Sequence, residues 1–160
     1  MIGFVRHWRK AFDISIVLLF GILGCDTQSE PGSPVEPEDA LATFAVPDGF
    51  KIELVAAEPL VADPVDMEID EYGRLYVVEM HGYPLDKSGS GNVVLLSDVN
   101  GDGKMDKRTV FAKGLTLPTG VMRWKRGILV TDAPNVLYFE DTDNDGAADV
   151  MDAVLTGFSL

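Results

Sequence analysis

Beyond residue 44, apolar residues occur in short runs that turn-forming residues separate. No stretch keeps the 3.6-residue spacing of an amphipathic helix, and the runs are rich in β-branched and aromatic side chains. The runs that we expect to be strands are residues 50–55, 74–80, 93–96, 109–111, 128–131 and 136–139. The pattern predicts an all-β domain over residues 44–160.

The predicted strands belong to a sequence repeat. Asn92–Asp98 aligns with Asn135–Asp141 at an offset of 43 positions, whereas Pro64–Gly73 matches residues 118–127 at an offset of 54. The two offsets differ because His81–Gly91 is an insertion in the first unit. A repeat of about 40–50 residues built from strands is typical of β-propellers, whose blades are four-stranded sheets. We expect two to three blades of an incomplete propeller, with a complete small β-domain as the alternative.

Two acidic loops lie at corresponding places in this repeat. Residues 98–106 and 141–149 share the pattern D-x-[DN]-x-D-G-x-x-D. Calcium takes about six to eight oxygen ligands, and side chains at positions 1, 3 and 5 can surround one ion when a glycine at position 6 permits a sharp turn. Position 7 offers a backbone carbonyl, and position 9 binds directly or through water. The predicted ligands are Asp98, Asn100, Asp102, Lys104 and Asp106 in the first loop, and Asp141, Asp143, Asp145, Ala147 and Asp149 in the second.

These loops differ from EF-hands. An EF-hand has a bidentate glutamate at position 12, where this chain has Thr109 and Asp152, and the flanking sequence is strand-like. The pattern therefore predicts two strand–loop–strand calcium sites. A solvated turn rich in aspartate and glycine is the alternative, and the two copies in register weigh against it.

The amino terminus has the features of an export signal. Basic residues precede an apolar run from Ile14 to Leu23, which is shorter than the ~20 residues that span a bilayer as a helix. The run ends at Ile22–Cys25, which resembles a lipobox, and Cys25 is the only cysteine. We expect residues 1–24 to be a lipoprotein signal peptide and Cys25 to be lipidated, with an uncleaved membrane anchor as the alternative.

The following segment, residues 25–43, is rich in proline and acidic residues and lacks apolar periodicity. Such sequence is typical of a flexible, disordered tether. Together these features predict a lipoprotein of the cell envelope, anchored to the membrane by lipid and facing the periplasm or the exterior.

Charge narrows the possible partners. The formal net charge is -13, and seven of the acidic residues lie in the two loops, so we expect no nucleic-acid partner. A single cysteine leaves no disulfide and no Cys-x-x-Cys-His haem attachment within these residues.

Candidate catalytic groups are sparse. Glu79, His81 and Tyr83 follow a predicted strand and offer an acid, a base and a hydrogen-bond donor, but a single histidine on a loop more often packs against its neighbours. The basic cluster at residues 123–126 is expected to be a solvated turn, with Trp124 in the core of its blade. We assign no catalytic residue.

Part of the chain resembles a known family. Pro47–Pro59, Asp70–Met80, the first acidic loop and Gly114–Gly120 resemble the start of the propeller in membrane-bound dehydrogenase domain proteins. That family is similar to glucose/sorbosone dehydrogenases and includes planctomycete and verrucomicrobial haem-binding proteins. The resemblance extends over about residues 44–160.

The resemblance implies an exported enzyme that oxidises sugars or alcohols. Its full-length form would use pyrroloquinoline quinone or haem and pass electrons to a cytochrome c. Glucose/sorbosone dehydrogenases carry a histidine in a Pro-His-Gly context, where this chain has Thr119, so no catalytic role is transferred. The alternative is a calcium-stabilised propeller that binds glycans or proteins without catalysis.

Overall fold

The computed structural model describes residues 34–159, and both of its sheets lie in one compact unit that begins at Val35. One helical segment of two parts precedes the strands: α1 (Pro37–Ala40) and the 3-10 turn η1 (Leu41–Thr43). The strands are β1 (Pro64–Ile69), β2 (Leu75–Glu79), β3 (Gly91–Ser97), β4 (Lys107–Leu115), β5 (Pro118–Trp124), β6 (Gly127–Asp132), β7 (Asn135–Glu140) and β8 (Val150–Thr156). The all-β prediction is confirmed.

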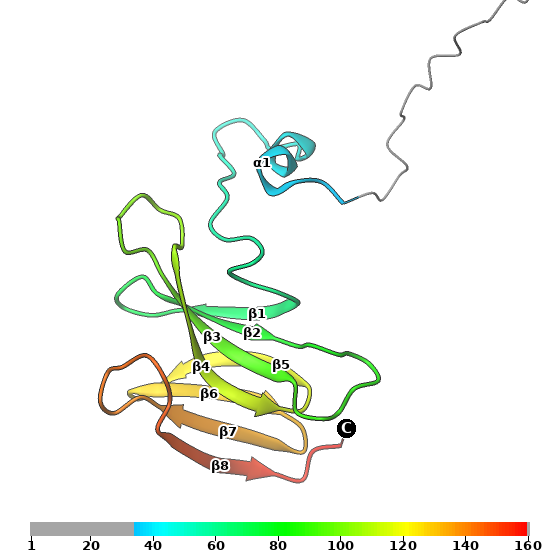
Figure 1. The fold of residues 1–160 in the computed structure, drawn as a ribbon, viewed down its shortest axis with the longest axis vertical. Helices are drawn as coiled ribbons and strands as arrows, with labels where there is room; N and C mark the ends of the chain where they lie inside the picture. Colours follow the sequence, from blue (N-terminus) through cyan, green and yellow to red (C-terminus); the bar gives the residue numbers. More distant parts are fainter. Residues whose placement is uncertain (1–33, 160) are drawn as a thin grey trace, which may run out of the picture. The chain divides into compact units, whose positions relative to one another are not determined.

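The strands form two antiparallel sheets of four. The first sheet has the order β1-β2-β3-β4 and the second has the order β5-β6-β7-β8, so each strand pairs with its neighbours in the sequence (Figure 1). Because the chain reverses direction at every turn, successive loops emerge at opposite ends of a sheet. The β1–β2 turn and the β3–β4 loop therefore share one end, and the β2–β3 loop lies at the other.

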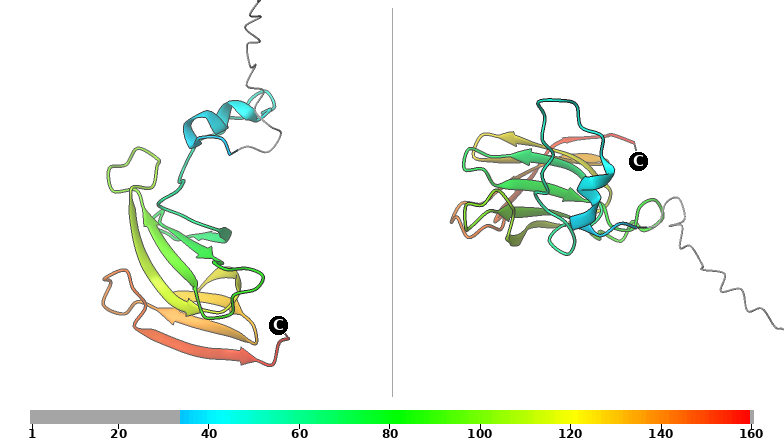
Figure 2. Two further views of the ribbon diagram at one scale, coloured as in Figure 1. Left: turned by 45° about the vertical axis from the view of Figure 1, so that its right-hand side comes forward. Right: turned by 90° about the horizontal axis from the view of Figure 1, so that it is seen from above.

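The main core lies between the two sheets, which lie one against the other (Figure 2, left). The first sheet contributes the buried side chains Tyr76, Val78, Val93, Leu95, Phe111, Ala112 and Leu115, and the second contributes Val121, Ile128, Val130, Leu137 and Phe139. Tyr76 and Phe111 pack edge to face, with ring centroids 4.9 Å apart. The first strands of the two sheets, β1 and β5, lie side by side.

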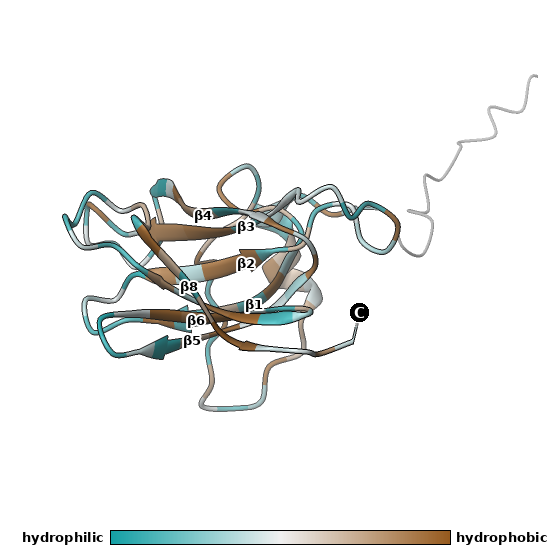
Figure 3. Cartoon of the chain, turned by 90° about the horizontal axis from the view of Figure 1, so that it is seen from below, coloured by the Kyte–Doolittle hydropathy of each residue, from teal (hydrophilic) through white to brown (hydrophobic). Residues whose placement is uncertain are grey.

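A second apolar cluster lies on the opposite face of the first sheet, which we call the outer face. It consists of Leu75, Val77, Val94 and Leu96, together with the exposed β1 side chains Val65, Met67 and Ile69. Among the described residues, Ala56, Val61 and Met105 cover part of this face. In Figure 3 much of the strand sequence is apolar and the loops are more hydrophilic.

The sequence pattern locates five strands and misses three. The predicted runs at residues 74–80, 93–96, 109–111, 128–131 and 136–139 correspond to β2, β3, β4, β6 and β7. The pattern does not predict β1, β5 or β8, and β1 and β5 each begin at a proline, a residue disfavoured in strands. The strand predicted at residues 50–55 is wrong, because within residues 34–159 that segment pairs with no neighbouring strand.

The predicted signal peptide, residues 1–24, and the lipidated Cys25 lie outside the described residues. Within the predicted tether, residues 37–43 form the short helical segment α1–η1. Among residues 34–159, no helix is long and apolar enough to cross a membrane.

Candidate metal-binding loops and a buried carboxylate network

The two acidic loops occupy the same place in their sheets. Residues 98–106 connect β3 to β4, and residues 141–149 connect β7 to β8 (Figure 1). Both loops leave from the third strand of a four-stranded meander, so they emerge at corresponding ends of the two sheets. The repeat found in the sequence is therefore a repeat in the structure.

The first aspartate of each loop organises the turn. The donors to the Asp98 carboxylate are the backbone N–H groups of Gly101, Asp102 and Gly103, and the donors to Asp141 are those of Asn144, Asp145 and Gly146. At position 6, Gly103 and Gly146 have φ angles of 88° and 93°, a conformation that glycine adopts without steric cost. The glycine at position 6 therefore permits the predicted turn in both loops.

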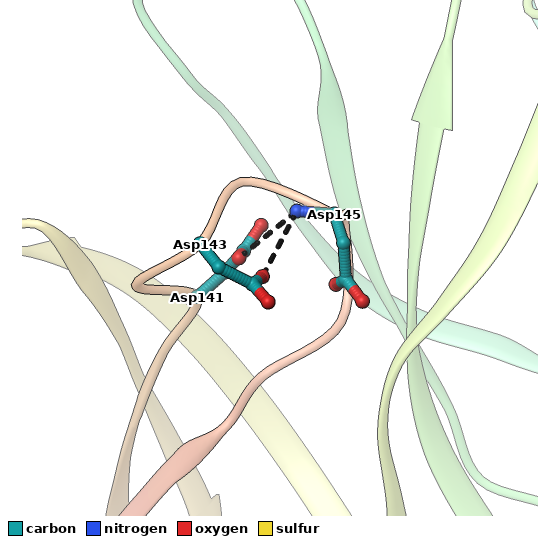
Figure 4. A group of neighbouring side chains, drawn as sticks. All are labelled: Asp141, Asp143 and Asp145. Atoms are coloured by element: carbon teal, nitrogen blue, oxygen red, sulfur yellow. Dashed lines mark hydrogen bonds between the residues drawn. The ribbon is translucent and has the colours of Figure 1, made fainter.

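Three carboxylates converge in the second loop. Oxygens of Asp141, Asp143 and Asp145 all lie within 4.8 Å of one another, and the three side chains gather inside the turn (Figure 4). Two oxygens that bind one calcium ion at about 2.4 Å can be at most about 4.8 Å apart. The spacing is thus compatible with one shared ion. In the first loop, Asn100 replaces the middle carboxylate and offers an amide oxygen.

The aspartate at position 9 closes each loop. Asp106 accepts the backbone N–H of Val99 at 3.0 Å, and Asp149 accepts that of Thr142 at 3.1 Å. The hydrogen bond from the Thr142 hydroxyl is the main cause that lowers the pKa of Asp149 below its usual value. The Gly103 N–H is the main cause that lowers the pKa of Asp98. Both groups are therefore ionised at neutral pH, as calcium ligands must be.

A buried carboxylate network lies at the opposite end of the first sheet. Glu79 is completely buried at the end of β2, and it accepts the backbone N–H of Ala62 at 3.0 Å and the guanidinium of Arg108 at 2.8 Å. Its second oxygen also lies 3.2 Å from Nε2 of His81, whose Nδ1 lies 3.0 Å from Asp63. The buried carboxyl group thus has Arg108, His81 and one backbone N–H as partners.

His81 is held between two carboxylates. Its pKa is raised, chiefly by the hydrogen bond to Asp63 and also by Glu79, while partial burial acts in the opposite direction. Because both ring nitrogens face carboxylate oxygens, neither is free to accept a proton from a substrate. Tyr83 is 70% exposed and takes no part in the network. The contacts therefore favour a structural role for His81, the more usual role for a loop histidine.

The second sheet contains an equivalent of Glu79. Asp132 is buried at the end of β6 and accepts the backbone N–H groups of Thr116 at 3.0 Å and Leu117 at 2.8 Å. Thr116 and Ala62 each stand two residues before the first strand of their sheet. In both sheets, a buried acid therefore anchors the chain that enters the first strand. The sequence repeat does not reveal this pair, because one acid is a glutamate and the other an aspartate, and they lie 53 positions apart rather than at the offsets of 43 or 54 found in the sequence.

In the basic cluster of residues 123–126, Lys125 and Arg126 form the expected turn, but Arg123 and Trp124 are the last residues of β5, and the prediction for Trp124 is wrong. Trp124 is 47% exposed, with the Lys125 ammonium 5.9 Å from its ring centroid. Arg123 and Arg126 each pair with a glutamate. Trp124 ends β5 and directly precedes the hairpin turn, so its side chain does not reach the core between the sheets.

The contacts of His81 with Asp63 and Glu79 predict a pH-dependent contribution to the stability of the fold. Because the pKa of His81 is higher in the folded state than in the unfolded state, protonation of His81 stabilises the fold. This contribution is fully present below the unfolded pKa of about 6.5 and is lost as the pH rises through the folded pKa. We expect His81→Gln to lower the free energy of unfolding by about 1 kcal/mol at pH 5.5 and by less at pH 9. Urea unfolding of both proteins measures the difference.

His81 is the only histidine after residue 25, so its proton NMR titration in the mature chain reports this pKa without overlap. A measured pKa at or below about 6.5 would contradict the contacts to Asp63 and Glu79.

Comparison with known proteins gives one match. Residues 36–160 match a family described as a domain of unknown function, DUF7133. No curated protein and no solved structure matches the chain.

Proposed function

This chain belongs to the DUF7133 family, and we propose that it supplies two blades of an exported, lipid-anchored β-propeller that bound calcium stabilises. The observation that carries the proposal is the repetition of the acidic loop, with the same hydrogen bonds, at the same place in two four-stranded meanders. Four antiparallel strands in sequence order make up one blade of a propeller.

Equivalent positions in the two sheets support the blade arrangement. Strand register relates Leu75, Val77, Val94 and Leu96 of the first sheet to Ile128, Val130, Leu137 and Phe139 of the second. The second set is buried against the first sheet, while the first set forms the outer face. Each sheet thus presents the same kind of face in the same direction. Repeated packing of this head-to-tail type leads to a ring when the rotation closes.

Calcium fits the chemistry of the loops. Each loop offers only oxygen ligands, two or three of them carboxylates at alternating positions, with one further acid at position 9. Without a cation, the clustered carboxylates repel one another. Sites of this kind in exported proteins work at about 10⁻⁴–10⁻³ M calcium. The ion would tie the third and fourth strands of each blade together.

Lipidation at Cys25 would hold the propeller at the membrane. The support is the position of the sole cysteine at the end of the apolar run. Diacylation anchors a protein far more firmly than one chain does. We expect Cys25→Ser to move the protein from the membrane fraction to the soluble fraction, whereas Thr27→Ser does not.

The resemblance to membrane-bound dehydrogenase domain proteins supports sugar or alcohol oxidation as the activity of the full-length protein. The residues of this chain do not fit the expected cofactors. Thr119 stands at the position of the expected histidine and hydrogen-bonds to Thr131 at 2.9 Å, and Cys25 alone cannot attach haem. Any catalytic group would come from other blades, so no step is assigned to the residues described here.

A binding role is the second candidate. It is favoured by the contacts of both His81 nitrogens with carboxylates, which leave neither nitrogen free to act as a base. Dye-linked oxidation of aldoses and primary alcohols by the protein purified from its native membrane separates the two roles. Dye reduction supports the dehydrogenase, and its absence in folded, calcium-loaded protein supports the binding module.

Calcium titration of loop variants tests the proposal. We expect calorimetry of residues 26–160 to find two bound ions, and each of Asp102→Asn and Asp145→Asn to weaken one site by roughly tenfold or more. Asparagine keeps an oxygen for the backbone N–H two residues on, so the loop retains its turn and loses only charge.

Asp152→Asn, on exposed β8, is the matched control and should still bind two ions. Identical titrations for all four proteins would contradict the assignment of the ligands.

A further inference from the structure

Residues 51–59 lie beside the first sheet but belong to no strand. In Figure 1, this part of the chain runs between η1 and β1 without an arrow. The sequence nevertheless favours a strand here, since Ile52, Leu54 and Val55 are branched apolar residues. Ile52 and Val55 are 37% and 40% exposed. Residues 51–59 therefore have a strand-forming sequence but lack a strand to pair with in the described structure.

A hydrogen bond that recurs in both acidic loops shows which strand this segment corresponds to. The N–H of Ala148, in the second acidic loop, donates to the carbonyl of Phe111 on β4 at 2.8 Å. The N–H of Met105, at the same position of the first loop, donates to the carbonyl of Val55, also at 2.8 Å. Val55 therefore has the same relation to the first sheet that Phe111 has to the second.

The side-chain contacts next to these hydrogen bonds support the same equivalence between residues 51–59 and β4. Phe111 and Ala112 of β4 pack against the second sheet at Ile128, Val130, Leu137 and Phe139. Ala56, which follows Val55 as Ala112 follows Phe111, packs against the equivalent positions of the first sheet, the outer face. The backbone that follows also matches, because Ala62 and Thr116 each donate to the buried acid of their own sheet.

We infer that residues 51–59 are the fourth strand of a further sheet, equivalent to β4 and β8. The remaining three strands of that sheet would cover the outer face of the first sheet. The occupant is thus a three-stranded antiparallel sheet of the same repeat that lacks its own fourth strand. A complete four-stranded sheet does not fit, because residues 51–59 already hold the place of its last strand.

The space left on the outer face matches this occupant. A groove of about 540 Å³ lies beside residues 55–61 and is lined mainly by apolar side chains of β1 and β2. Met67 and Ile69 are 62% and 60% exposed there. The incoming sheet would fill the groove with apolar side chains and pair its edge with residues 51–59. In this way, the N-terminal part of the chain would close a ring of blades.

A strand-replacement chimera tests the assignment of the segment. Residues 150–158 of the chain 26–160 are replaced by the sequence of residues 51–59, so that the segment takes the place of β8. We expect cooperative unfolding with a Tm within about 5 °C of the parent, whereas a scrambled order of the same nine residues lowers the Tm by more than about 10 °C. Equal destabilisation by the two sequences overturns the assignment.

A truncated chain tests the docking. A protein that ends at Asp149 lacks β8, so its second sheet has three strands and an open edge at β7. When it is mixed with the intact chain, we expect a 1:1 complex in sedimentation, or recovery of its fold if it is unfolded alone. Leu54→Pro with Val55→Pro in the intact chain should abolish this association. Successive N–H groups of a strand point to opposite sides, so two adjacent prolines always remove the one that would pair with the partner.

Phe44→Pro with Ala45→Pro, upstream of the segment, is the matched control and should leave association unchanged. No complex and no recovery of the fold would overturn the docking. The inference rests on the proposed blade arrangement but not on calcium. A chimera that binds calcium but fails to fold better than its scrambled control therefore contradicts the strand assignment and leaves the calcium proposal standing.

Discussion

Replacing Glu79 with alanine is expected to lower the free energy of unfolding by about 3–5 kcal/mol. The substitution removes the acceptor for the Ala62 N–H and the Arg108 guanidinium and leaves their polar groups partly buried without it. Removing one partner of a buried ion pair costs more than the pair contributes, because the remaining charge is uncompensated. Urea unfolding at pH 7 measures the change.

Exposed Glu38→Ala is the matched control and should change stability by less than about 0.5 kcal/mol. Asp132→Ala should cost less than Glu79→Ala, since Asp132 serves backbone donors and no paired side-chain cation. A loss below about 1 kcal/mol for Glu79→Ala would show that the network contributes little.

Calcium removal is expected to have the second large effect. A ligand that binds only the folded state at ten times its dissociation constant, as 1 mM calcium would be for a site of about 10⁻⁴ M, stabilises it by about 1.4 kcal/mol, so two ions give roughly 3 kcal/mol. For a domain of this size, that corresponds to a rise in Tm on the order of 10 °C between EDTA and millimolar calcium. Differential scanning calorimetry measures the shift.

Magnesium at the same concentration is the control, because it requires a tighter octahedral site and retains its waters. It should raise the Tm by much less. Equal melting temperatures in EDTA and calcium, for a cooperatively folded protein, would mean that the acidic loops are solvated turns.

The sequence predicts the repeated features of the fold best. The offset of 43 positions places β3 on β7 and one acidic loop on the other, and both correspondences hold in the structure. The turn glycines Gly103 and Gly146 also have the backbone conformation that the pattern requires. These features are predictable because they depend on local sequence alone.

Features that depend on tertiary contacts were not predictable. The segment around Val55 has a strand-forming sequence but no neighbour to pair with, so its propensity does not decide its structure. The side-chain partners of Glu79 are His81, which also contacts Asp63, and Arg108, which lies 29 positions after Glu79 in the chain. The local pattern groups Glu79 with His81 but does not connect them to Asp63 or Arg108. A glutamate that ends an apolar strand is the one signal that points to a buried, paired acid.

The central claim is that each acidic loop holds one calcium ion in equivalent places of two blades. The most direct measurement is a crystal structure of residues 26–160 grown in calcium, with anomalous scattering used to locate the ions. We predict two ions, one bound by Asp98, Asn100, Asp102, Asp106 and the Lys104 carbonyl, and one by Asp141, Asp143, Asp145, Asp149 and the Ala147 carbonyl, directly or through water at position 9. Ordered loops with no anomalous peak would contradict the claim.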